Sequence, residues 1–288
     1  MTERDREVAL YLYRHRVLTT DQLQLLFFSS RRRAQDRLLF LYRNRVLDRF
    51  YPPAPFGSGK PEAHWLLDEA GAILVAAMHD LERKQLGWQR RDDWGSHPQL
   101  AHHLETNRFL TDLIAATLTD ADLGVSAWWP PAEAADHLNQ RRRGRVLPDA
   151  GFYLETWAGP IECYLEWDRA TETQARLAEK LLAYRLAEAE LFEEGKPPRG
   201  ILFVVPGPRR LETLRRALHR LRARTGGPSR QAFRLQPRRT LAAHRNQPRG
   251  RTRPDRRRRR PISQPWPTNS SGSSPKASRR RRRRSSGS

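Results

Sequence analysis

Apolar residues recur at helical spacing three times within the first fifty residues of the chain. The first stretch is DREVALYLYRHRV, whose apolar residues share one broad helical face: Val8, Leu10, Leu12 and Tyr13. The second is LTTDQLQLLFF, in which Thr19 and Gln22 have the spacing of a capping box. The third is RRRAQDRLLFLYRNRVL, which is basic at its start and apolar from Leu38 to Leu41. These patterns predict three helices.

Alternating patterns follow the three helices. Two strands are predicted in VLDRFYP and EAHWLLDEAG, and the segment between them, PAPFGSGKP, is rich in turn-forming residues. Three helices followed by a two-stranded wing is the element order of a winged helix-turn-helix. The pattern therefore predicts a winged helix-turn-helix DNA-binding domain over residues 1–80.

A second unit is predicted after a polar patch, KQLGWQRRDDWGSHPQ, which we assign to a linker at 81–96. Over residues 97–224 the patterns predict a helix (98–119), a strand (124–129), a loop, two strands (149–156 and 161–168), a helix (171–192), a strand (200–205) and a helix (209–223). The last strand contains the continuous apolar run GILFVVPGP, typical of a strand buried on both faces. Its position after a helix indicates a crossover into the same sheet. The predicted fold class is α/β, or α+β for the chain as a whole.

The charge divides the chain at about Thr225. The whole chain has a net charge of +22, but residues 225–288 hold 20 Lys and Arg and one Asp, a net charge of +19. Residues 1–224 therefore carry only +3. The later segment is rich in Arg, Pro, Ser and Gly, which predicts a disordered Arg-rich tail. Arginine runs bind phosphate backbones without reading sequence, although RNA, an acidic protein or a membrane surface would satisfy the same runs.

The single cysteine and the lack of long apolar segments exclude several classes of protein. Cys163 alone allows no intramolecular disulfide and no cysteine-based zinc site, and its apolar surroundings predict a structural thiol. No apolar stretch approaches the ~20 residues that cross a bilayer. The N-terminus, MTERDREVAL, has no signal-peptide pattern. We expect a cytoplasmic protein without a membrane partner.

The basic start of the third helix is the first candidate site. In a helix-turn-helix, the N-terminal residues of the second helix of the motif face the bases of the major groove. Arginine pairs with guanine and glutamine with adenine, which makes the following residues the candidate DNA contacts: Arg31, Arg32, Arg33, Gln35 and Arg37. Lys60 at the wing tip is predicted to reach a phosphate. The alternative is a solvated basic face on a helical packing module.

Acidic residues at strand ends form the second candidate site. Side chains alternate along a strand, so Glu166 and Asp168 point to one face while Trp167 points away. Asp149 opens the adjacent strand, and Glu105 on the preceding helix supplies a fourth carboxylate. Carboxylates hold Mg²⁺ on a phosphate, where the metal activates a water. The alternative is that these are solvent-facing acids at strand ends.

The order of these elements resembles two known groups of proteins. Helix, three strands, helix and strand, with PD and E-x-D at these places, is similar to the restriction-endonuclease-like αβββαβ core of the PD-(D/E)xK nuclease superfamily. The chain to about Arg224 resembles the replication-relaxation family of plasmid and mobile-element proteins. The segments that carry this resemblance, taken in their order, are LTTDQLQLLFF, HWLLDEAGA, HHLETNRFL, LPDAGFYL, ECYLEWDRATET, KLLAYR and ILFVVPGPRRLETL. The family name implies a role in replication or DNA relaxation of mobile elements.

The chain departs from the nuclease pattern at Asp168, where the superfamily places a lysine. Lys180 lies on the following helix, three residues after Leu177 and four before Tyr184, at the edge of the sheet-facing stripe. It is the candidate for a displaced catalytic lysine. The resemblance then implies a catalytic set of Asp149, Glu166, Asp168 and Lys180. The alternative is a core that has lost catalysis and keeps a binding role, with Lys180 on the surface.

Three functions remain open on these grounds. The leading interpretation is a DNA-binding accessory protein of plasmid or mobile-element replication, relaxation or mobilisation, with double-stranded DNA as its partner. The second is a Mg-dependent DNA endonuclease, or nickase, in which Mg²⁺ is the cofactor only if the nuclease-like site is active. The third is a non-catalytic module that binds a replication initiator or a relaxase.

Overall fold

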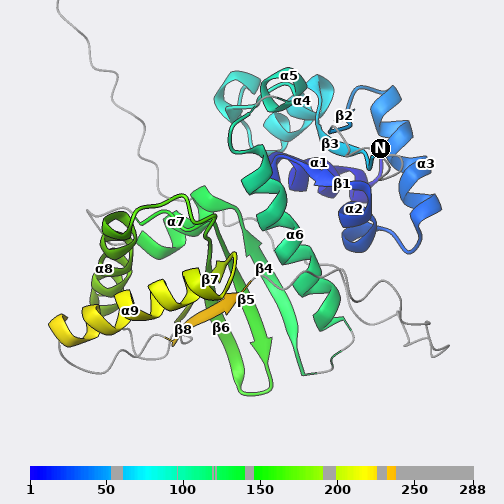
Figure 1. Cartoon of the computed structure of the whole chain (residues 1–288). Helices are drawn as coiled ribbons and strands as arrows, with labels where there is room; N and C mark the ends of the chain where they lie inside the picture. Colours follow the sequence, from blue (N-terminus) through cyan, green and yellow to red (C-terminus); the bar gives the residue numbers. More distant parts are fainter. Residues whose placement is uncertain are drawn as a thin grey trace, which may run out of the picture.

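A computed structural model describes residues 1–52, 61–95, 97–118, 120, 122–139, 146–190, 199–225 and 232–237. It contains both helices and sheets, which confirms the predicted α/β class. Figure 1 shows a helical unit with a small sheet, in blue and cyan, and a second unit built on a larger sheet, in green and yellow. The long helix α6 (Leu100–Thr117) runs between them.

The N-terminal unit has the predicted helices and strands in the predicted order. Its elements are α1 (Glu3–His15), β1 (Leu18–Thr19), α2 (Thr20–Phe27), α3 (Arg31–Arg43), β2 (Leu47–Phe50) and β3 (His64–Leu67). The capping box at α2 is present, because the Thr19 hydroxyl accepts from the Gln22 amide and the Gln22 side chain accepts from the Thr19 amide. The strands form an antiparallel sheet in the order β1-β3-β2.

The residues after β3 differ from the prediction. The strand β3 ends at Leu67, and the helix α4 (Glu69–Met78) follows where EAHWLLDEAG was predicted as strand throughout. Asp68 caps this helix by accepting from the Glu69 amide, a start signal that the alternating pattern concealed. The segment predicted as a linker contains η1 (Arg83–Leu86) and α5 (Arg91–Gly95). Leu86 and Trp94 are buried there, so this segment packs as part of the fold.

The second unit is built on a five-stranded sheet in the order β4-β5-β6-β7-β8. Its strands are β4 (Gly124–Trp129), β5 (Ala150–Thr156), β6 (Gly159–Trp167), β7 (Arg199–Val205) and β8 (Ala232–Pro237). The first three strands pair antiparallel, and β7 and β8 add in parallel. Its helices besides α6 are α7 (Pro131–Asn139), α8 (Gln174–Glu190) and α9 (Pro208–Thr225).

Two of these elements correct the prediction. The helix α7 lies where a loop was expected, and its signal was Pro131, because proline is favoured at the first position of a helix. The strand β8 lies inside the segment predicted as a disordered tail from Thr225, so that prediction is wrong for Ala232–Pro237. The short alternating run AFRLQP pairs in parallel with the edge of β7, which outweighs the polar composition around it. The rest of the predicted tail lies outside the described residues.

Helices cover both faces of the large sheet. Adjacent strand residues face opposite layers, so Leu165 packs on the side of α6 with Leu110, while Tyr164 packs on the side of α7, α8 and α9 with Leu181. Cys163 is half-buried, and burial raises the pKa of its thiol to about 12, as expected of a structural thiol. Two residues of the predicted acidic site, Glu166 and Asp168, are bound by side chains of α8 and α9 on the second of these faces.

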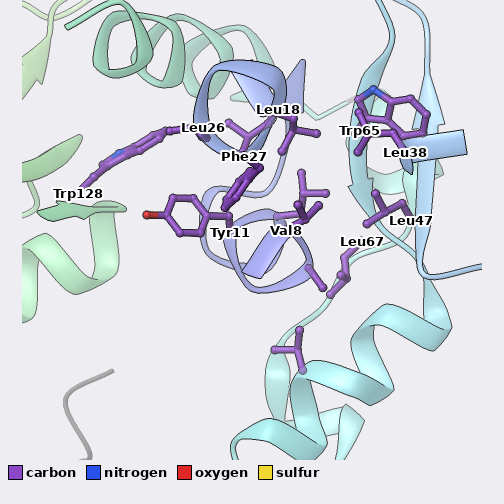
Figure 2. Close-up of a cluster of buried hydrophobic side chains, with 14 of the residues drawn as sticks. Val8, Tyr11, Leu18, Leu26, Phe27, Leu38, Leu47, Trp65, Leu67 and Trp128 are labelled. Carbon is purple, nitrogen blue, oxygen red and sulfur yellow. The ribbon is translucent and has the colours of Figure 1, made fainter. Parts of the chain in front are cut away.

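The two units share one hydrophobic core. Figure 2 shows Tyr11 of α1 between the helical bundle and Trp128 of β4. The ring of His15 stacks on Trp128 with centroids 3.8 Å apart, and the Asn107 side-chain amide donates to the carbonyls of His15 and Val17, each at 2.9 Å. Continuous packing of this kind fixes the helical unit against the sheet.

Candidate functional site

Antiparallel pairing of β5 and β6 places Asp149 opposite Glu166. The register pairs Ala150 with Leu165, and the Asp149 amide donates to the Leu165 carbonyl at 2.9 Å. The Asp149 carboxylate accepts from the Trp167 amide at 2.7 Å. These bonds fix the carboxylate of the PD motif at the end of the sheet, beside the carboxylate of the next strand.

Lys180 reaches this point from α8. Its ammonium group lies 2.7 Å from one Glu166 oxygen and 3.2 Å from the Glu172 carboxylate. The Tyr184 hydroxyl donates to the other Glu166 oxygen. The packed face of α8 contains Leu177, Lys180 and Tyr184, which follow one another at helical spacing. The Lys180 ammonium group and the Tyr184 hydroxyl therefore lie on the same side of the helix and bind one carboxylate.

Burial controls the protonation of this cluster. Glu166 is only 1% exposed, and burial together with the charge of Asp149 raises the pKa of its carboxyl to about 7, against the opposing effect of Lys180. Burial lowers the pKa of Lys180, but attraction to Glu166 outweighs it and the pKa is raised overall. Burial and the Glu166 charge raise the pKa of Tyr184 well above its usual value. The lysine therefore stays charged while Glu166 titrates near neutral pH.

Asp168 belongs to a separate pair. It lies just beyond β6, where its amide donates to the Val204 carbonyl and its carboxylate binds two nitrogens of the Arg210 guanidinium from α9. The same carboxylate accepts from the Ala170 amide at 2.7 Å. Sequence reasoning missed Arg210, because nothing in the local pattern connects residues 42 positions apart.

Glu105 and His102 lie on α6. The Glu105 carboxylate accepts from the Trp167 indole at 2.9 Å, and Trp167 points to the sheet face opposite that of Glu166. Glu105 is therefore not gathered with Glu166. His102 binds Asp149 at 2.9 Å, and this bond raises the pKa of His102. Its neighbour His103 does not share this role, and burial lowers its pKa to about 4.

The arrangement does not fit a bound magnesium ion as it stands. Within the described ranges, no group of three or more His, Cys, Asp or Glu side chains is placed to hold a metal. The Asp149 oxygens receive His102 and the Trp167 amide, and the Glu166 oxygens receive Lys180 and Tyr184. The site is an ion-paired cluster in which Asp149, Glu166 and Lys180 lie side by side.

The predicted DNA contacts lie on the first turns of α3, which Ser30 caps. Arg32 and Gln35 are exposed, and the closest carboxylate to Arg32 is that of Asp36 at 3.9 Å. Arg31 pairs with Asp21, and Arg33 donates to the Ser29 hydroxyl at 3.0 Å. These residues share the solvent-facing side of the helix start. Lys60 lies outside the described residues.

Arg37 is placed differently from the other candidates on α3. Its guanidinium binds both carboxylate oxygens of Asp5, which is 1% exposed. Burial alone would raise the pKa of Asp5, but the bonds from Arg37 and Thr2 lower it to about 2. This pair joins α3 to α1.

Comparison with known proteins gives one match, which spans both units. The model of the replication-relaxation family matches residues 10–199, about two thirds of the chain. The chain belongs to the replication-relaxation family. Membership supports a role in replication or relaxation of plasmids and mobile elements. No curated protein and no solved structure matches the chain. None of the helices in the described segments is long and apolar enough to span a membrane.

Proposed function

We propose that this member of the replication-relaxation family is a DNA-binding accessory protein of plasmid or mobile-element replication, relaxation or mobilisation. The observation that carries the proposal is the exposed start of α3, where Arg32, Arg33 and Gln35 face solvent on the second helix of an α2–α3 pair. The order α1-β1-α2-α3-β2-β3, with the sheet β1-β3-β2, supports a winged helix-turn-helix. In that motif this part of α3 enters the major groove.

The contacts of these side chains divide them into two kinds. The pair between Arg31 and Asp21 is exposed, and exposed pairs are weak enough for a phosphate or base to displace them. In the part of the chain that the structure describes, the Arg33 guanidinium donates to the Ser29 hydroxyl and to no carboxylate. Arg37 is committed to the buried Asp5, so we assign it to holding α3 in place.

Base contacts from α3 are tested with paired substitutions in the full chain. Duplexes selected by the wild-type protein from a random pool serve as ligands, with scrambled duplexes for comparison. We expect the Arg32→Ala, Gln35→Ala double variant to bind the selected duplex about tenfold or more weakly and to lose its preference over the scrambled one. The matched control is Arg108→Ala, Gln89→Ala, which removes the same exposed residue types from positions outside α3. Equal behaviour of the two variants would favour the solvated-face alternative.

A second candidate function is nicking of DNA by the nuclease-like unit. It is favoured by the convergence of Asp149, Glu166 and Lys180, the residue types of a PD-(D/E)xK site with its lysine moved to α8. It is disfavoured because the oxygens of both carboxylates already have partners.

Supercoiled plasmid incubated with the protein and Mg²⁺ or Mn²⁺ separates the two functions. A binding role predicts that the plasmid stays supercoiled. Nicking that disappears in the Asp149→Ala, Glu166→Ala double variant would establish the endonuclease. Nicking that survives this variant would come from another site or from a contaminant.

A further inference from the structure

The helix α9 presents a strongly basic outer face. Its inner face packs on the sheet through Leu211, Leu214 and Leu218, all buried. Its exposed basic residues are Arg209, Arg215, Arg216, Arg220, Arg222 and Arg224. Glu212 is the one acidic residue of the helix.

Four of these arginines form a ridge along the helix. At 100° per residue, Arg209, Arg216, Arg220 and Arg224 fall within about 80° of one another. From first to last they span about 22 Å at 1.5 Å per residue. The last three follow at intervals of four residues, which is about 6 Å along the helix axis.

The ridge is not neutralised by its neighbours. Among the residues that the structure describes, no carboxylate lies within ion-pair distance of Arg209, Arg220 or Arg224. Arg216 pairs with Glu212 at 3.1 Å, and both side chains are exposed, so the pair is weak. A face that serves solubility alone usually mixes both signs. The adjacent helix α8 has such a mixed face, with Arg176 beside Glu179.

The ridge starts beside the ion pair between Arg210 and Asp168. Arg209 precedes Arg210, whose guanidinium binds Asp168 at the end of β6. Figure 1 shows α9, in yellow, running from this end of the sheet beside α8. The Arg210 guanidinium also donates to the Glu172 carbonyl, and the Glu172 carboxylate lies 3.2 Å from Lys180. A polyanion laid along the ridge would therefore have one end near the cluster of Asp149, Glu166 and Lys180.

We propose that the outer face of α9 is a second DNA-binding surface, which contacts the phosphates of one duplex without reading its sequence. The inference rests on the proposed function for its choice of duplex DNA as the polyanion. It adds a surface in the other unit: α3 and α9 lie on opposite sides of α6 (Figure 1). In this arrangement α3 selects the sequence, and α9 holds the backbone next to the nuclease-like site.

The test uses the full chain and a charge-matched control. The ridge variant is Arg216→Gln, Arg220→Gln, Arg224→Gln, which leaves the buried side of α9 unchanged. The control is Arg6→Gln, Arg108→Gln, Arg176→Gln, which removes three exposed arginines from three other helices. Equal thermal unfolding midpoints of all three proteins establish that the fold is retained.

Affinity for a duplex of about 40 base pairs is measured across a salt series. Each phosphate contact contributes roughly −0.9 to the slope of log affinity against log salt. We expect the magnitude of the slope to fall by up to about 2.7 in the ridge variant, for three contacts, and to be unchanged in the control. Equal slopes in the ridge variant, the control and the wild type would overturn the proposal.

Arginine footprinting reports DNA contacts at each arginine separately, so contacts made by residues 238–288 are not mistaken for contacts made by the ridge. Modification by phenylglyoxal, followed by peptide mass spectrometry, should show protection of the ridge arginines by duplex DNA and none of the control arginines. Protection by duplex RNA but not by DNA would overturn the choice of partner. Wild-type protein that binds no DNA would overturn the proposed function as well. If the ridge variant had the salt slope of the wild type while the α3 variant lost its preference for the selected duplex, only the proposal for α9 would be overturned.

Discussion

Glu166 is a carboxylate whose burial makes the stability of the protein depend on pH. Its pKa is raised from the ordinary value of 4.5 to about 7, so between these pH values the folded state binds more protons than the unfolded state. The free energy of unfolding contributed by Glu166 is therefore fully present below pH 4.5 and falls as the pH rises to about 7. His15 is buried in its neutral form and acts in the opposite direction.

Comparison with Glu166→Gln isolates this effect. The free energy of unfolding of the wild type minus that of the variant should decrease by on the order of 1–3 kcal/mol between about pH 5 and about pH 7.5. Urea unfolding at several pH values measures it. Glu179→Gln, which changes an exposed glutamate on α8, is the control and should show no such change. A pH-independent difference for Glu166→Gln would contradict the assignment.

The buried imidazole ring of His15 lowers the stability of the protein. Both ring nitrogens are buried and have no hydrogen-bond partner among the described residues, while the ring stacks on Trp128. Phenylalanine keeps the stacking and removes the unsatisfied atoms, so His15→Phe should raise the free energy of unfolding by about 1 kcal/mol or more. His102→Phe is the contrasting variant, because it breaks the bond to Asp149 and should destabilise. Destabilisation by His15→Phe would show that a ring nitrogen is satisfied after all.

Residue-scale prediction from sequence succeeded where a local period determines the position. Alternation along β6 and the stripe of α8 are enough to direct Glu166 and Lys180 to one place. The bonds from Arg210 to Asp168 and from His102 to Asp149 depend on how distant elements pack. No period in the sequence records that packing, so these partners could not be predicted.

At the scale of elements, α4 approaches the turn before β2 so closely that only glycine fits. A Cβ atom on Gly71 would lie 2.2 Å from the Val46 carbonyl oxygen. Gly71→Ala should therefore reduce the free energy of unfolding by about 1–3 kcal/mol, since backbone must move. Gly207→Ala is the control, because nothing lies within 4 Å of its Cβ position, and its effect should stay within about 1 kcal/mol. Denaturant unfolding of the two variants measures the difference, and similar losses would refute the close approach.

Elements with a strong period or cap were predictable, and the others were concealed by neighbouring signals. The capping box of α2 gave its start from the sequence alone. The start of α4 was concealed because HWLLDEAG continues the alternation of β3. The helix α7 was concealed because its prolines are typical of loops as well as of a helix start. β8 depends on a parallel partner that only the folded sheet provides.

At the scale of the whole molecule, the shared core makes the two units one folding body. Tyr11 and Phe27 of the helical unit belong to the same cluster as Phe152 and Leu165 of the large sheet. The Arg14 side chain also bridges the units, by donating to Glu133 of α7 at 2.9 Å. The surfaces of α3 and α9 that we propose to bind DNA are therefore held at a fixed geometry, which sequence-based domain boundaries did not indicate.

The edge strand β8 determines where the chain can be shortened without loss of stability. β8 pairs with β7 along its length, so removal of residues 226–288 would expose the edge of β7. A chain that ends at Pro237 should keep the thermal midpoint of the full chain, whereas one that ends at Thr225 should unfold at a lower temperature. Circular dichroism melts compare the three. Equal midpoints for the two shortened chains would mean that β8 adds no stability.

The chain that ends at Pro237 then separates the charge of residues 238–288 from that of the rest of the chain. Residues 238–288 hold 18 of the 54 Lys and Arg residues and one of the 32 acidic residues, a net charge of +17. Because each neutralised phosphate adds roughly −0.9 to the salt slope, the full chain should lose DNA binding steeply as salt rises. The shortened chain should show a shallower slope, due to α3 and α9, and keep any sequence preference. Both chains are titrated on one duplex across a salt series. Equal slopes would show that residues 238–288 do not touch the DNA, and their arginine runs would then require a different partner.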